Sequence, residues 1–428
     1  MVLRVLVSAY AVSPCWGSEP GMGWNWISNL ARYCDLQIIT EGEWRKEIEM
    51  SLSAALKGNF DDSVNPTRLT KEQAERMHFH YLPVSPEIRR MCWNQGTWRF
   101  YYYYAQWQKR CLVKAKEIIA STSIDVIHQL NMIGFREPGD LWKIENIPLV
   151  WGPIGGVGTY PKSFLKGESY NLKFKVYLKN ILNYLSFRYL PRVRKCFKHS
   201  SSLVAATKQT LEAVQDYYHK EISLINETGC FANADNYPHP SNNELFKILW
   251  VGKYDYMKQL GIAIRTMGRL RHKQNIVLNV LGSGYEKDVK KYQNLVCELG
   301  LEASVKLLGS VPNVQVHKMM QESDLFFFTS IGDATSTVVP EAISSGLPVL
   351  CHDTCGFGPI VDDSIGRKVE VISPDYSIKN FAAIIEELES NRAEVRRLST
   401  NCLSRRHEIS WDSHARKMVE IYSKLVSS

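Results

Sequence analysis

The feature that most limits how this chain can fold is its repeated alternation of short apolar runs with helical patterns. The run VLRVLVSAY at residues 2–10 is followed by GMGWNWISNLARY at residues 21–33, a helical pattern entered through glycines. The same rhythm returns in CDLQIIT, SIDVIHQL and IPLVWGP, and later in FKILWVG, NIVLNVLGSG, DLFFFTS and LPVLCHD. Strands that alternate with helices form parallel sheets with helices on both faces. We therefore predict an α/β fold.

The alternation pauses once, in a segment rich in Asn and Pro that runs from Phe231 to Phe246. A chain of 428 residues is too long for one ordinary hydrophobic core. We predict two doubly wound, Rossmann-like domains that face a central cleft, at residues 1–235 and 236–405. A C-terminal helix at 406–428 is expected to pack back toward the first domain. In such sheets ligands bind beyond the carboxyl ends of the strands, so we expect the functional residues in those loops.

The bulk composition excludes several classes of protein. With 45% hydrophobic and 22% charged residues, the chain is globular rather than disordered. No apolar run approaches the roughly 20 residues that a membrane-spanning helix needs. The first residues resemble a weak signal peptide, but Arg4 is their single basic residue and the apolar run is short and β-branched. A first buried strand is the favoured interpretation.

The ten cysteines show no regular pairing pattern, which is typical of reduced thiols in a cytosolic protein. Cys351 and Cys355 suggest a metal site, but no second pair of ligands lies at zinc-finger spacing. No Asp-x-Asp motif is present to hold a cation. We therefore expect no metal.

Two lysines follow the strand ILWV, in the stretch GKYDYMKQLG. Gly252 allows a tight exit from the strand, and Lys253 and Lys258 then stand near the start of the next helix. Two cations at a helix N-terminus suit a diphosphate, although solvated surface lysines are the simpler alternative. Gly282 lies in the next strand-to-helix turn, LGSG, which is either an ordinary tight turn or part of a base or ribose pocket.

The first strand is followed by GSEPGMGWNW, in which Gly21 and Gly23 open a helical pattern. Backbone amides at such a turn can approach a phosphate closely. A nicotinamide dinucleotide site is disfavoured because the third glycine is missing. The second strand also ends near only one acidic residue, Glu41.

Two carboxylates flank a small-residue turn in TSIGDATSTVVPEAISSGLPVL. Asp333 and Glu341 lie on opposite sides of this turn, so both can reach one extended ligand. Carboxylates accept hydrogen bonds from vicinal hydroxyls, such as those of ribose or a sugar. The turn also offers free main-chain amides to a phosphate, at Thr335, Ser336, Thr337 and Val338. The alternative is that Glu341 only caps a helix.

In this order the motifs resemble the C-terminal half of a retaining GT-B glycosyltransferase of family 4, also called glycosyl transferases group 1. GPIGG at residues 152–156, the glycine turn at 17–26 and SWDSHARKMVEIYSKL at 410–425 extend the resemblance over nearly the whole chain. The combination is specific, although each piece alone is not. The resemblance implies that residues 1–235 face the acceptor and that residues 236–405 bind the nucleotide sugar.

The resemblance also assigns roles to individual residues. Lys253 and Lys258 would hold the donor diphosphate, Glu341 would bind the ribose, and Asp333 would face the transferred sugar. The family's usual Glu and Arg are replaced by Asp333 and Lys253, which bears on the identity of the donor sugar. A histidine common in the family is absent from LVWGP. His128 ends the neighbouring strand and is a candidate substitute, with a buried structural histidine as the equal alternative.

The resulting hypothesis is a retaining hexosyltransferase that needs no cofactor and uses a nucleotide-diphosphate sugar as co-substrate. The acceptor would be a glycan or a lipid-linked molecule in cell-surface polysaccharide synthesis. A nucleotide-sugar epimerase or a sugar phosphorylase of the same fold is the main alternative. A non-catalytic binding protein for a sugar or nucleotide is a further one.

The excess positive charge is concentrated in residues 161–198, which contain ten Lys or Arg and one acidic residue, Glu168. A stripe of apolar residues falls there at helical spacing: Phe174, Tyr177, Leu178, Ile181, Leu182 and Leu185. Lysines flank the stripe, and further cations follow it: Arg192, Arg194, Lys195 and Lys198. A basic amphipathic helix can lie in an anionic membrane interface. Packing of the stripe on the first domain is the alternative, and no nucleic-acid motif accompanies the charge. We expect a cytoplasmic protein with peripheral attachment to the inner face of the cytoplasmic membrane.

Overall fold

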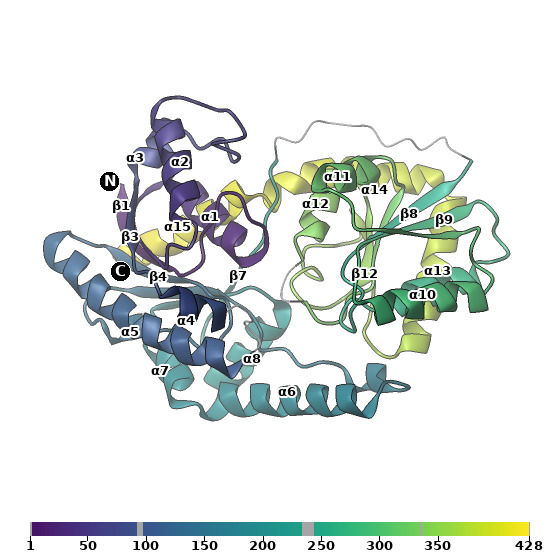
Figure 1. The fold of residues 1–428 in the computed structure, drawn as a ribbon, viewed down its shortest axis with the longest axis horizontal. Coiled ribbons are helices and arrows are strands. Elements are labelled where there is room, and N and C mark those ends of the chain that lie inside the picture. The colour runs from purple at the N-terminus through teal and green to yellow at the C-terminus, as the bar shows by residue number, and fades with distance from the viewer. Residues whose placement is uncertain (1, 92–96, 233–243, 334–335, 428) are drawn as a thin grey trace. The chain divides into compact units, whose positions relative to one another are not determined.

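The computed structural model describes residues 2–91, 97–232, 244–333 and 336–427 (Figure 1). The chain divides into two compact units. The first unit comprises Met1–Gly158, Ile181–Glu227 and Trp411–Ser428. The second unit comprises Thr159–Asn180 and Thr228–Ser410.

Over its described residues, the first unit contains a seven-stranded sheet in the order β3-β2-β1-β4-β5-β6-β7. The strands are β1 (Leu3–Ala9), β2 (Cys34–Thr40), β3 (Met77–Tyr81), β4 (Val126–Asn131), β5 (Leu149–Ile154), β6 (Ser202–Ala205) and β7 (Ser223–Leu224). The helices are α1 (Ser18–Leu30), α2 (Arg45–Leu56), α3 (Lys71–Glu75), α4 (Pro86–Met91), α5 (Trp98–Ser121), α7 (Pro191–His199), α8 (Lys208–Tyr218) and α15 (Trp411–Ser427). Helix α6 (Tyr170–Tyr189) contains the chain division between Asn180 and Ile181.

The interior strand β1 pairs in parallel with β2 on one side and β4 on the other. Successive side chains of a strand point to opposite faces of the sheet. Val5 and Val7 accordingly join the cluster that contains Trp26 of α1, whereas Leu6 joins the cluster that contains Trp107 of α5. Because both faces are covered, the strand is apolar along most of its length.

Over its described residues, the second unit contains a six-stranded sheet in the order β10-β9-β8-β11-β12-β13. The strands are β8 (Phe246–Val251), β9 (Ile276–Leu281), β10 (Val305–Gly309), β11 (Leu325–Phe328), β12 (Val349–His352) and β13 (Gly366–Val369), and adjacent strands pair in parallel. The helices are α9 (Leu260–Arg269), α10 (Glu286–Glu298), α11 (Asn313–Gln321), α12 (Val338–Ser344), α13 (Pro374–Ser390) and α14 (Arg392–Glu408). The prediction of two doubly wound parallel sheets is confirmed.

The residues 159–180 cluster with the second unit, whereas the predicted first domain ran without interruption to residue 235. Phe164 is buried in the core of the second unit, and its ring lies 5.8 Å from that of His352. Tyr160 packs on Gly332, where a Cβ atom would lie only 2.1 Å from the tyrosine ring. These two contacts link residues 159–180 to the second unit.

The predicted boundary between residues 235 and 236 lies outside the described residues and stays a prediction. At the C-terminus, α15 belongs to the first unit, where it packs on α1 and β4. None of the helices in the described part of the chain is long and apolar enough to cross a lipid bilayer.

Candidate functional site

The sheet of the second unit changes winding direction beside β8. From β8 the chain moves to β9 and β10 on one side, and then crosses to β11 on the other side. Ligands of open α/β sheets bind in the crevice at the carboxyl ends of the strands where this change occurs. Lys253 and Lys258 follow β8, and Asp333 follows β11. The topology therefore brings these three predicted residues to the expected position.

The turns after β8 and β9 are in close contact. The amide of Gly252 donates to the carbonyl of Leu281 at 3.0 Å, and the amide of Gly282 donates to the carbonyl of Gly309 at 2.8 Å. Gly282 has a φ of +130°, and a Cβ atom there would lie 1.8 Å from the carbonyl oxygen of Gly252. Glycine is therefore required at this position for a structural reason that does not depend on any ligand.

Replacing Gly282 with alanine is expected to destabilise the second unit by about 3 kcal/mol, because the new Cβ meets backbone and the backbone angle is strained. Gly268 in α9 is a matched control, since a Cβ atom there would make only ordinary contacts, of 3.6 Å or more. Gly268→Ala should be neutral or slightly stabilising. Thermal unfolding of both variants measures this, and equal melting temperatures would contradict the packing of the two turns.

The ammonium group of Lys258 forms an ion pair with the carboxylate of Asp333. Their side chains are 16% and 25% exposed, so the pair is mostly buried but remains open to a ligand. Burial raises the pKa of the Asp333 carboxyl, and the charge of Lys258 opposes this shift. The residue predicted to bind the diphosphate and the residue predicted to face the sugar thus lie in direct contact.

A buried histidine that was not among the predicted site residues holds this loop in place. Nδ1 of His352 lies 3.1 Å from the carbonyl oxygen of Thr329, and Nε2 lies 2.8 Å from the hydroxyl of Ser377. Because a carbonyl only accepts, Nδ1 carries the proton and Nε2 accepts from Ser377. Burial lowers the pKa of His352 to about 4, so the ring is neutral at physiological pH.

The hydroxyl of Thr329 continues this network to the loop after β8. It accepts from the indole nitrogen of Trp250 at 3.0 Å and donates to the carbonyl of Lys258 at 2.8 Å. On the following loop, the amide of Asp333 lies 3.2 Å from the sulfur of Cys355. His352 and Cys355 flank Asp353 in the stretch considered above for a metal. In the described part of the chain no group of three or more His, Cys, Asp or Glu could hold a metal ion.

Glu341 lies in α12, and burial raises the pKa of its carboxyl while His317 opposes the shift. Ser336 is buried and hydrogen-bonds the carboxyl of Asp333, and Thr337 is exposed. Val338 is half-buried at the start of α12, and Thr335 lies outside the described residues. A phosphate or ribose contact from any of these residues stays a prediction.

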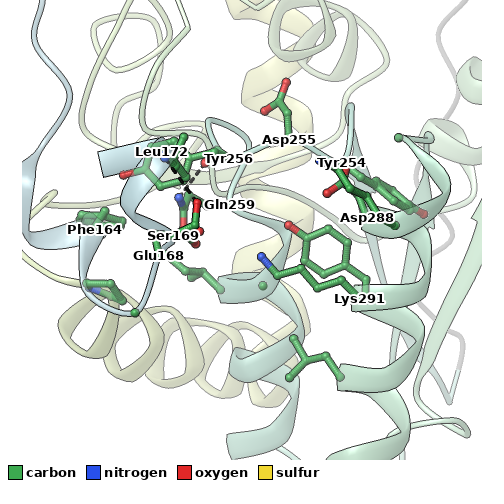
Figure 2. Close-up of a pocket in the computed structure, with 18 of the residues that line it drawn as sticks. Phe164, Glu168, Ser169, Leu172, Tyr254, Asp255, Tyr256, Gln259, Asp288 and Lys291 are labelled. Atoms are coloured by element: carbon green, nitrogen blue, oxygen red, sulfur yellow. Dashed lines mark hydrogen bonds between the residues drawn. The ribbon is translucent and has the colours of Figure 1, made fainter. Parts of the chain in front are cut away.

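Lys253 is exposed and lines a cavity of about 1340 Å³ within the second unit. Figure 2 shows Phe164 and Glu168 on one side of this cavity and Asp288 and Lys291 on the other. Among the predicted site residues, Lys253 is the one that lines it, so the cavity adjoins the Lys258–Asp333 pair without containing it.

His128 has a structural role rather than the catalytic one considered above. It is fully buried in β4, with Nε2 donating to the carbonyl of Gly152 at 2.7 Å and Nδ1 accepting from the hydroxyl of Tyr422 at 2.6 Å. Burial lowers its pKa to about 4. Because both nitrogens are occupied inside the protein, the ring is not available to a substrate.

Gly21 and Gly23 lie within the first two turns of α1. A Cβ atom at Gly21 would lie 2.2 Å from the carbonyl oxygen of Trp16, and one at Gly23 would lie 2.3 Å from that of Ala11. Close packing of α1 on the preceding loop explains both glycines, and a phosphate contact from them stays a prediction.

Glu19 lies in the first turn of the same helix and was not among the predicted site residues. Its carboxylate accepts from the amide of Ile133 at 3.0 Å, and burial raises its pKa to about 7. Its place at the start of a glycine-rich helix is the sequence pattern that could have identified Glu19 as a candidate.

Residues 233–404 match the family Glycosyl transferases group 1. An uncharacterized glycosyltransferase of Methanocaldococcus jannaschii is 27% identical over 41% of this chain and 44% of that protein. The N-acetylgalactosamine-N,N'-diacetylbacillosaminyl-diphospho-undecaprenol 4-alpha-N-acetylgalactosaminyltransferase of Campylobacter jejuni is 31% identical over 36% of this chain and 41% of that protein. The chain thus matches less than half the length of these curated relatives.

Solved structures match over nearly the whole chain. A glycosyltransferase from Rickettsia africae superposes with a TM-score of 0.63 at 15% identity, covering 99% of both chains. Anabaena HepE in complex with UDP superposes with a TM-score of 0.58 at 13% identity, covering 99% of this chain and all of the other. These likenesses concern the fold, and they confirm the predicted GT-B class.

Proposed function

Because residues 233–404 match the family Glycosyl transferases group 1, we propose that this chain is a retaining glycosyltransferase of that family. It transfers a hexose-type sugar from a nucleotide-diphosphate sugar to a glycan or lipid-linked acceptor. The single observation that supports this most is the Lys258–Asp333 pair at the change in winding direction of the second sheet. A cation and a carboxylate side by side match the two charges that develop when a glycosyl phosphate bond breaks.

In the proposed reaction, the bond between the anomeric carbon and the diphosphate breaks, and a bond to an acceptor oxygen forms on the same face of the sugar. Lys258 and Lys253 neutralise the departing diphosphate, and the acceptor hydroxyl transfers its proton to that leaving group. Asp333 stabilises the positive charge that develops on the sugar. Preorganised charges of this kind are often the largest catalytic contribution. Glu341 accepts hydrogen bonds from the ribose hydroxyls.

The name of one relative supports a particular class of acceptor. The Campylobacter jejuni protein carries a diphospho-undecaprenol substrate in its name. This supports a lipid-linked acceptor in cell-surface polysaccharide synthesis, and work at the inner face of the cytoplasmic membrane. Anabaena HepE has been solved with UDP, which makes uridine diphosphate sugars the first donors to test.

A thermal-shift panel of UDP-, GDP- and ADP-sugars tests the donor, and the proposal expects one nucleotide series to raise the melting temperature. The stabilising sugar is then incubated with and without lipid-linked acceptors. Transfer that requires an acceptor and retains the anomeric configuration supports the proposal. Conversion of the donor without an acceptor favours an epimerase or phosphorylase, and binding without turnover on any acceptor favours a non-catalytic binding protein.

A further inference from the structure

Helix α6 carries its apolar stripe on the solvent side. All six residues of the predicted stripe are exposed: Phe174, Tyr177, Leu178, Ile181, Leu182 and Leu185. The exposed fraction reaches 68% for Phe174 and 55% for Ile181. Tyr170, Tyr184 and Tyr189 are exposed on the same helix. The alternative that this stripe packs on the first domain is therefore wrong, and a contiguous exposed apolar surface of this kind marks an interaction site.

The opposite face of α6 attaches the helix to the protein partly through amides. Val176 and Phe187 are buried, and between them lie Asn180 and Asn183. Asn180 exchanges two hydrogen bonds of 3.0 Å with the backbone of Tyr160, and Asn183 donates to the backbone at Gly156 and Gly158. The inward face thus carries two asparagines beside Val176 and Phe187, whereas most of the large apolar residues of α6 point outward, unlike those of an ordinary surface helix.

Lysines border the exposed stripe on both sides. At about 100° per residue, Lys175 and Lys179 fall on one flank of the stripe and Lys173 falls on the other. Long lysine side chains at such flanks can lie along an apolar surface while their charges reach a polar layer. Residues 161–198 carry ten cations and one acidic residue. The surface is therefore apolar at its centre and positive at its edges.

The cations after α6 are less suited to contact a partner than the sequence pattern suggested. Arg192 in α7 forms an ion pair with Glu137 and donates to the carbonyl of Arg136 at 3.0 Å. Lys195 lies over the ring of Trp142 at 5.9 Å. These contacts hold α7 within the first unit. On α6, Lys179 likewise donates to the hydroxyl of Tyr160 at 2.8 Å, so Lys173 and Lys175 are the better candidates for an external partner.

We propose that α6 lies flat in the interface of an anionic lipid bilayer, with its stripe at the acyl boundary and its lysines at the headgroups. Tyrosines suit that position because their rings are apolar and their hydroxyls are polar. A second copy of this chain is a poorer partner, since a symmetric contact through α6 would place one strongly basic segment against another. This inference rests on the proposed function at a membrane face. Membrane binding and sugar transfer can nevertheless be tested separately, because transfer to a soluble acceptor does not require α6 to bind lipid.

Co-sedimentation of the full chain with vesicles tests the inference. The chain is expected to bind vesicles of equimolar phosphatidylcholine and phosphatidylglycerol, and to bind pure phosphatidylcholine weakly. Phe174→Ser with Ile181→Ser should weaken binding about tenfold or more, because two apolar side chains leave the interface. Val113 and Val314 are exposed apolar residues on α5 and α11, and Val113→Ser with Val314→Ser is the matched control that should bind normally.

The charged flank is tested in the same assay. Lys173→Gln with Lys175→Gln should weaken binding about fivefold for each lysine, and raised salt should weaken it further. Lys116→Gln with Lys379→Gln removes two lysines elsewhere and should leave binding unchanged. Equal sedimentation with both vesicle types, or no sedimentation with either, would overturn the proposal. A second result would also overturn it. In that case light scattering shows a dimer, the Phe174→Ser with Ile181→Ser variant is monomeric, and the unaltered chain does not bind vesicles. Donor turnover on a soluble acceptor should persist in every variant.

Discussion

Replacing Lys258 with alanine is expected to lower kcat/KM for sugar transfer by about 100-fold or more, because one of the charges that stabilises the leaving diphosphate is lost. The side chain is 16% exposed and forms an ion pair with Asp333. At such a mostly buried site, charge–charge interactions are stronger than in water. Initial rates over a range of donor concentrations give kcat/KM directly.

Lys290→Ala is the matched control for this experiment. It also removes a lysine from a lysine–carboxylate pair, but that pair with Glu286 lies exposed on α10. Its kcat/KM should stay at the level of the unaltered protein. Because Lys258→Ala leaves Asp333 without its charged partner, the double variant Lys258→Ala with Asp333→Asn is measured as well, together with the melting temperature of each. Turnover near the normal level in a folded Lys258→Ala protein would refute the site.

Asp333→Asn is expected to lower kcat by about 100-fold while the affinity for the donor changes within about threefold. The carboxylate acts on charge that develops only in the transition state, so its loss affects the chemical step more than ground-state binding. Asparagine keeps the size of the side chain and removes the charge. Single-turnover rates and donor titrations separate the two quantities.

The exposed residue Asp363 provides the control, since Asp363→Asn changes the same group at a surface position away from the site. A normal kcat in Asp333→Asn would mean that the carboxylate only positions the substrate. A large loss of donor affinity with an unchanged kcat would also contradict the assigned role, and would make Asp333 a binding residue.

Much of the fold follows from short-range patterns in the sequence. The run at residues 2–10 contains β1, and the run FKILWVG contains β8, because a strand covered on both faces must be apolar along its length. The same rule locates the loops after β8 and β11, so the amino-acid pattern alone places Lys258 and Asp333 at one edge of the sheet. Gly282 in the stretch LGSG likewise predicts a tight turn between strand and helix.

The remaining features depend on contacts between residues far apart in the chain. The catalytic and structural interpretations of His128 could not be separated in the sequence, because its partner Tyr422 lies 294 residues away and no local pattern joins them. His352 was not predicted for the same reason, since its ring hydrogen-bonds the carbonyl of Thr329, which lies 23 residues earlier in the chain. For α6, periodicity identified the apolar stripe but could not tell which side of the helix faces solvent. That depends on Asn180 and its bonds to Tyr160.

The central claim, a nucleotide-diphosphate site at the carboxyl edge of the second sheet, is tested most directly by calorimetric titration of UDP, GDP and ADP into the full chain. We expect one of these diphosphates to bind, and Glu341→Gln and Lys258→Ala each to weaken it about tenfold through the loss of a charge-assisted contact. Glu370→Gln, at an exposed position on the same unit, should bind like the unaltered protein. If no diphosphate binds, or if all three variants bind alike, the second sheet does not hold a nucleotide diphosphate at its carboxyl edge.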